Sequence, residues 1–169
     1  MKHAGVAGYP IEHSLSPIIH EAGYKALNLD WKYEKYSLKV DELSDFISKR
    51  DKDFIGLSLT MPLKEKAVEI ADSVTEMAKL VNSANTIIFK DNKVFSGNTD
   101  IYGIIQALKT NKKLDLSNPC VIGSGATARS ALLALKNMGT KQVMLCARNE
   151  NKILEIIELA EKLGLRVQK

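Results

Sequence analysis

The sequence has few cysteines, prolines and tryptophans: its 169 residues include two cysteines, four prolines and one tryptophan. Cys120 and Cys146 each lie in an apolar, strand-like run, with no CxxC pair and no histidine nearby. Two isolated cysteines exclude a disulfide-dense secreted scaffold. We predict buried, reduced thiols in a cytoplasmic protein, with a disulfide or a metal site as the less favoured alternatives. His13 and His20 also lack the spacing of metal ligands, so no metal site is expected.

Long apolar runs are absent as well, so no membrane span is expected, and the N-terminus lacks a signal-peptide pattern. The 24 basic and 20 acidic residues are mixed along the chain. Because the basic residues form no stripe with interleaved aromatics, we do not expect nucleic-acid binding. The hydrophobic share of 45% predicts a packed core. The length suits one domain, or one complete domain and part of a second.

The first part of the chain alternates strand-like and helix-like segments. Strands are predicted over Lys2–Gly8, Trp31–Leu38 and Phe54–Leu59. This β-α-β-α-β rhythm predicts an α/β domain with a mostly parallel sheet. Further on, Asn85–Lys90 and Val94–Asn98 flank an Asp-Asn turn and are expected to pair as a hairpin.

Two serines lie at the start of the first predicted helix. Ser16 is expected to be its N-cap and Pro17 its first residue. Ser14 and Ser16 then lie beside a helix N-terminus, where hydroxyl and free N–H groups can bind a carboxylate or several hydroxyls. Ordinary capping is the alternative, which explains Ser16 well and Ser14 less well.

The stretch GLSLTMPLKEK, residues 56–66, contains a lysine in an unusual place. We expect Pro62 to open a helix and Lys64 to lie in its first turn. A lysine is unfavourable there because the helix dipole is positive at that end. An acidic partner and a polar ligand would explain a lysine at this position. The candidate partner is Asp100, 36 residues further on. The alternative is a solvated surface lysine, the ordinary state of most lysines.

A glycine-rich loop follows the polar stretch Thr110–Pro119, near which we place a domain boundary. Its sequence matches GxGxx(G/A) between a predicted strand and a predicted helix, which predicts a dinucleotide site. A glycine turn without a nucleotide is the alternative. At the end of the next strand, Arg148 and Asn149 stand where an NAD site would have an acidic residue, so we expect NADP(H). The loop residues are Gly123, Ser124, Gly125, Ala126, Thr127 and Ala128.

Six motifs in one order give the chain a family resemblance: HSLSP, GLSLTMPLK, VNSANT, GNTDIYG, GSGATAR and ARN. Together they resemble the shikimate dehydrogenase family over the whole chain. The resemblance implies NADPH-dependent reduction of 3-dehydroshikimate to shikimate, in aromatic amino-acid biosynthesis. It implies a substrate-binding α/β domain, residues 1–110, followed by the first part of a Rossmann-like NADP-binding domain, residues 111–169. The family commonly has Asn at Ser58 and Gly at Ser83, and it continues beyond the end of this sequence.

The resemblance also implies roles for single residues. Lys64 and Asp100 would be the catalytic pair, and Ser14 and Ser16 would bind the substrate carboxylate. Thr60, Asn85 and Asp100 would bind its ring hydroxyls. Independently, reduction of a ketone creates an alkoxide that needs a proton, which a lysine ammonium can supply.

Two alternatives stay open at this point. One is a quinate/shikimate dehydrogenase with broader cofactor use. The other is an inactive fragment or a shikimate-binding module, because a dinucleotide domain of this kind has about six strands and the sequence supplies three. An exposed edge at the last strand would favour self-association.

Overall fold

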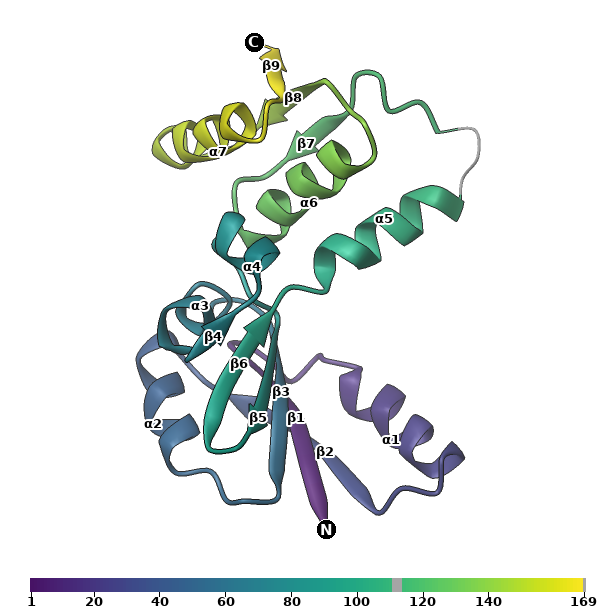
Figure 1. Cartoon of the computed structure of the whole chain (residues 1–169), viewed down its shortest axis with the longest axis vertical. Coiled ribbons are helices and arrows are strands. Elements are labelled where there is room, and N and C mark those ends of the chain that lie inside the picture. Colours follow the sequence, from purple (N-terminus) through teal and green to yellow (C-terminus); the bar gives the residue numbers. More distant parts are fainter. Residues whose placement is uncertain (111–113, 169) are drawn as a thin grey trace. The chain divides into compact units, whose positions relative to one another are not determined.

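The computed structural model describes residues 1–110 and 114–168 and divides into two compact units, Met1–Gly97 and Asn98–Lys169. In Figure 1 the first unit runs from purple to teal and the second from green to yellow. In the described residues, no helix is both long enough and apolar enough to cross a membrane.

The first unit is built on one six-stranded mixed sheet with the strand order β2-β1-β3-β5-β6-β4. β1 pairs in parallel with both β2 and β3, whereas β5 runs antiparallel to β3 and to β6, as the hairpin prediction requires. The carboxyl ends of β1 and β3 therefore share one edge of the sheet with the amino end of β5. The strands are β1 Lys2–Gly8, β2 Trp31–Ser37, β3 Phe54–Leu59, β4 Ser73–Val74, β5 Thr86–Lys90 and β6 Lys93–Gly97.

Helices lie on both faces of this sheet (Figure 1). Along β1, Ala7 belongs to the main core cluster with residues of α2, α3 and α4, whereas Ala4 and Val6 belong to a smaller cluster against which Tyr24 of α1 packs. Since neighbouring strand residues point to opposite faces, the two clusters occupy opposite sides of the sheet. The helices are α1 Ser16–Ala26, η1 Val40–Glu42, α2 Leu43–Ser48, α3 Lys66–Ile70 and α4 Glu76–Leu80.

The second unit contains a three-stranded parallel sheet with the order β7-β8-β9. Helix α6 contacts β7 and helix α7 contacts β8, and the helix α5 packs along α6. The elements are α5 Asp100–Thr110, β7 Cys120–Ile122, α6 Ala126–Asn137, β8 Gln142–Cys146, α7 Glu150–Lys162 and β9 Arg166–Gln168.

Only one face of this second sheet is buried in the described part of the chain. Val121 and Val143 are buried, whereas Cys120 and Cys146 are free and exposed and Ile122 is 83% exposed. The prediction of buried cysteines is therefore wrong. The alternation of β7 and β8 places both thiols on the sheet face opposite the buried valines.

The division of the chain falls after Gly97, earlier than the boundary near residue 110 that the sequence suggested. The reason is that α5 packs on α6. The Asn98 side chain supports this packing, because its amide donates to Ser130 Oγ at 2.9 Å and its carbonyl accepts from the Ile101 N–H. The functional assignment of the two parts stays a prediction.

Gly56 of β3 lies very close to the backbone of β5. A Cβ built on Gly56 would lie 2.5 Å from the backbone oxygen of Ile87, which has no freedom to move away as a side chain would. Only glycine fits here without separating the two strands.

We expect Gly56→Ala to lower the free energy of unfolding by about 1–3 kcal/mol, because it overpacks the β3–β5 contact. Gly23→Ala is the matched control, since a Cβ at Gly23 in α1 meets nothing within 4 Å. That change should stabilise the protein by about 0.5–1 kcal/mol. Urea unfolding followed by the fluorescence of Trp31 measures both; equal effects would contradict the close approach.

Candidate functional site

Main-chain hydrogen bonds join the ends of four strands, β1, β3, β5 and β6, at the carboxyl edge of the first sheet. The Thr60 N–H donates to Ala7 O at 2.9 Å, just beyond β3 and near the end of β1. The Leu59 N–H donates to Asn85 O at 2.8 Å, and the Asn85 N–H donates to Gly97 O at 3.0 Å. Thr60 and Asn85 are thus fixed on neighbouring strands at the same edge.

Lys64 is held at this edge by its own backbone. Its carbonyl accepts a hydrogen bond from the Ala84 N–H at 2.8 Å, and the preceding Leu63 is fully buried. The Lys64 side chain is half-buried. Ala84 directly precedes Asn85. This one hydrogen bond therefore fixes the backbone of Lys64 beside that of Asn85.

The structure corrects the expected helix around Lys64. α3 begins at Lys66, so Pro62 and Lys64 lie in the turn before it and not in its first turn. The Leu63 N–H donates to Thr60 O, which closes a tight turn, and the Lys64 carbonyl bonds to Ala84 instead of to a later helical N–H. The lysine therefore lies outside the helix whose dipole made its position seem unfavourable.

The two serines also lie at this edge, because α1 follows β1 and helices that follow parallel strands begin at the carboxyl edge. Ser16 is the first helical residue and not the N-cap, a position that Leu15 takes. Ser14 Oγ accepts a hydrogen bond from the Ser16 N–H at 3.3 Å. The capping contact thus comes from Ser14, and both serines are half-buried.

Asp100, the predicted acid partner, is the first residue of α5 and belongs to the second unit. It is half-buried. Its pairing with Lys64 and its contact with a substrate hydroxyl stay predictions.

The glycine loop of the second unit has the geometry that its sequence predicts. Gly123 has φ +124°, which a residue with a side chain rarely adopts, and its N–H donates to Cys146 O at 2.7 Å. A Cβ on Gly123 would lie 4.0 Å from the Ala128 Cβ, and a Cβ on Gly125 would meet nothing within 4 Å. A Gly123 Cβ would thus just reach van der Waals contact with Ala128, and a side chain at Gly125 would meet open space.

This loop fits a phosphate group. Gly125 is the N-cap of α6, so the first N–H groups of α6 have no partner within the helix. Those groups and the helix dipole favour an anion at this end. Ser124 and Ala126 flank the open glycine, and Thr127 lies exposed in the first turn.

The residues after β8 have different local roles. Asn149 is the N-cap of α7, and its side-chain oxygen accepts a hydrogen bond from the Lys152 N–H at 3.1 Å. Arg148 is exposed in the loop between β8 and α7. Asn149 was predicted to bind the cofactor, and this capping role was not predicted.

Tyr33 lies near the candidate site and was not predicted from the sequence to have a role there. It is buried on β2, and its hydroxyl donates to Ser58 Oγ at 2.8 Å. Burial raises its pKa, the hydrogen bond with Ser58 partly offsets this, and Tyr24 adds a smaller increase. Its place at a core-facing position of the alternating strand Trp31–Leu38 is the sequence signal that could have identified it.

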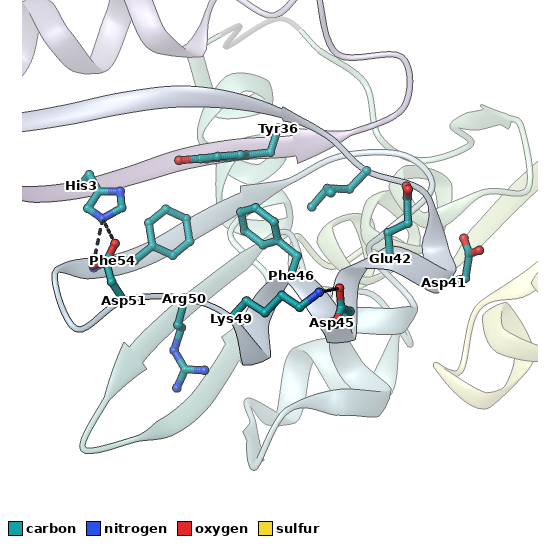
Figure 2. Close-up of a pocket in the computed structure, with 11 residues that line it drawn as sticks. His3, Tyr36, Asp41, Glu42, Asp45, Phe46, Lys49, Arg50, Asp51 and Phe54 are labelled. Atoms are coloured by element: carbon teal, nitrogen blue, oxygen red, sulfur yellow. Dashed lines mark hydrogen bonds and ion pairs between the residues drawn. The ribbon is translucent and has the colours of Figure 1, made fainter.

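A cavity of about 590 Å³ lies elsewhere in the first unit, beside α2 (Figure 2). His3 Nε2 lies 3.0 Å from Asp51 Oδ2 there, and Lys49 Nζ donates to Asp45 Oδ2 at 2.7 Å. Burial, followed by the charge of Glu34, raises the pKa of Tyr36 in this cavity to about 12. The residues that line it are all outside the candidate site, so we place no activity there.

Comparisons with known proteins show a similarity to shikimate dehydrogenases. Residues 6–87 match the model of the shikimate dehydrogenase substrate binding domain. The pentafunctional AROM polypeptide of Saccharomyces cerevisiae strain YJM789 is 37% identical over 93% of this chain, which spans 10% of that polypeptide.

Two crystal structures agree with this match. Shikimate dehydrogenase from Mycobacterium tuberculosis is 36% identical, with a TM-score of 0.89 over 99% of this chain and 63% of that one. Shikimate 5-dehydrogenase from Thermus thermophilus, in complex with NADP(H) and shikimate, is 30% identical. Its TM-score is 0.87, over 100% of this chain and 63% of the Thermus thermophilus chain. The sequence thus spans under two thirds of each of these relatives. The chain is thus similar to shikimate dehydrogenases over 99% or more of its own length in these two structures.

Proposed function

We propose that the protein containing this chain catalyses the NADPH-dependent, reversible reduction of 3-dehydroshikimate to shikimate in the cytoplasm. The observation that supports this most is the main-chain hydrogen bonding that brings Thr60, Lys64 and Asn85 to one edge of the first sheet. A hydroxyl, an ammonium and an amide at one edge provide the polar groups that a polyhydroxylated ring carrying a ketone requires.

The substrate would be held by two sets of groups. Ser14 and Ser16, at the N-terminus of α1, would donate to its carboxylate, which the helix dipole also favours. Thr60, Asn85 and Asp100 would hydrogen-bond the ring hydroxyls. The crystallised Thermus thermophilus relative is a complex with NADP(H) and shikimate, which supports the same ligand class here.

Lys64 would act as the general acid–base group. In the reduction, its ammonium would donate a proton to the oxygen that becomes the new hydroxyl, and in the oxidation its amine would accept that proton. Asp100 would orient the ammonium and bind a hydroxyl. The Lys64 carbonyl is fixed by Ala84, so the reach of the ammonium is set by side-chain torsions alone.

The loop Gly123–Ala128 would hold the pyrophosphate of NADP(H), with Gly125 and the α6 N-terminus against the phosphates. Arg148 would bind the 2′-phosphate through its planar guanidinium, with Asn149 beside it. The bound cofactor supplies the hydride, and the protein supplies position and charge.

One alternative rests on the described second sheet, which has three strands where such a domain has about six. A chain of these 169 residues would then bind shikimate without turnover, or complete its sheet by self-association. A quinate/shikimate dehydrogenase is a further alternative. Comparing quinate with shikimate as substrates, and NAD⁺ with NADP⁺, separates it from the main proposal.

We expect Lys64→Ala to lower turnover by roughly 10²–10⁴-fold while shikimate binding changes little, because the acid–base group is lost and the binding groups remain. Lys66→Ala is the control, since Lys66 pairs with Glu69 on α3 and has no role in the proposed site. NADPH absorbance with saturating shikimate and NADP⁺ measures turnover, and calorimetry measures binding. Near-normal turnover in Lys64→Ala would refute the role; binding without turnover in the unmutated chain would favour the binding module.

We expect Arg148→Ala to weaken NADP⁺ binding by about 10-fold or more, because charge-assisted hydrogen bonds to the 2′-phosphate are lost. NAD⁺, which lacks that phosphate, should bind the variant and the unmutated chain equally. Arg166→Ala, at an exposed position on β9, is the control. Calorimetric titration with both nucleotides provides the comparison, and an equal loss for NAD⁺ would contradict 2′-phosphate recognition.

A further inference from the structure

Helix α1 contributes no buried residue to the core of the first unit. None of its side chains is buried, and Ile18 and Ile19 on its first turns are 68% and 67% exposed. Apolar burial therefore does little to fix its N-terminus, where the two serines lie. Other contacts must set the position of this end.

One such contact begins at His20. Its Nδ1 lies 2.8 Å from the carbonyl oxygen of Ser16, so Nδ1 carries the hydrogen and donates. The imidazole is stacked on the ring of Tyr33, with the centroids 3.9 Å apart and the planes inclined by 9°. The first turn of α1 is thereby attached to a buried ring on β2.

Tyr33 continues the connection to β3. Its hydroxyl donates to Ser58 Oγ at 2.8 Å, and Ser58 is two residues before Thr60 on the same chain segment. Tyr33 is 4% exposed, and its acceptor Ser58 is half-buried. His20, Tyr33 and Ser58 thus form a continuous bridge from the serine end of α1 to the strand that ends at Thr60.

We propose that the bridge of His20, Tyr33 and Ser58 fixes the distance between the carboxylate-binding serines and Thr60. These three are positioning residues: they act through Ser14, Ser16 and Thr60 and set how strongly the site prefers a substrate with a free carboxylate. This inference rests on the proposed function, because it assigns the serines to that carboxylate.

The test compares shikimate with its methyl ester, which keeps the ring hydroxyls and lacks the charged carboxylate. Tyr33→Phe keeps the stacked ring and removes the hydroxyl, and Ser58→Ala removes the acceptor. Each variant should bind shikimate about fivefold more weakly, which is the effect of losing one ordinary hydrogen bond. The affinity of each variant for the methyl ester should stay within about twofold of that of the unmutated chain. The double variant should lose no more than either single one, because both changes break the same contact.

Tyr24→Phe is the matched control. Like His20, Tyr24 lies on α1 and has its ring near that of Tyr33, with the two centroids 6.5 Å apart. It removes a hydroxyl that is outside the bridge, so both affinities should stay unchanged. Calorimetry with the whole chain gives the affinities. Equal weakening of both ligands by Tyr33→Phe would show a merely structural role and overturn the proposal.

A second readout needs no ligand. Amide hydrogen exchange at Ile19 and His20 should be about fivefold faster in Tyr33→Phe and in Ser58→Ala, with the amides of α2 unchanged. Unchanged exchange would overturn the bridge whatever the affinities are. If the unmutated chain binds neither ligand, the proposed function fails, and exchange then decides the bridge by itself.

Discussion

The arrangement of the first unit depends on the antiparallel pairing of β3 with β5. Their register places Leu57 opposite Ile87 and Ser58 opposite Thr86, with both Leu57 and Ile87 buried. This pairing requires a glycine at position 56, where a Cβ would lie 2.5 Å from the backbone oxygen of Ile87. Because β5 runs against β3, the residue that precedes it, Asn85, arrives where β3 ends. A parallel β5 would have carried the amide to the far end of the sheet.

Main chain, more than side chain, fixes the polar groups of the candidate site. Thr60, Lys64 and Asn85 are each held by backbone hydrogen bonds of 2.8–3.0 Å. The glycine loop of the second unit uses backbone in a different way, with N–H groups of α6 left for an anion. In both units, the candidate functional groups lie where a regular element starts or stops, since only there are backbone donors and acceptors available outside the hydrogen bonds of helices and sheets.

Strands were predictable from the sequence because burial leaves a clear pattern. Lys2–Gly8 and Phe54–Leu59 were predicted with the bounds that the structure shows. The start of α3 was not, because a helix of five residues is too short to show a helical period. The exposure of the cysteines also escaped prediction, since an apolar strand does not tell whether one or both of its faces will be covered.

The candidate site residues were predicted from local motifs and from the family resemblance, and the structure adds contacts that join some of them. The contact between the Lys64 carbonyl and Ala84 links two segments twenty residues apart, which no local pattern encodes. The bridge through Tyr33 likewise depends on tertiary contact between α1, β2 and β3. Neither the stacking partner of a histidine nor the acceptor of a tyrosine hydroxyl can be read from spacing.

The hairpin of β5 and β6 also has a practical consequence. Its turn at Asp91 and Asn92, both with positive φ, lies at the opposite end of the strands from Asn85 and Gly97. Five residues of strand separate the two ends by roughly 17 Å. The turn is therefore a place where a fluorophore or an affinity tag can be inserted while the polar edge keeps its geometry.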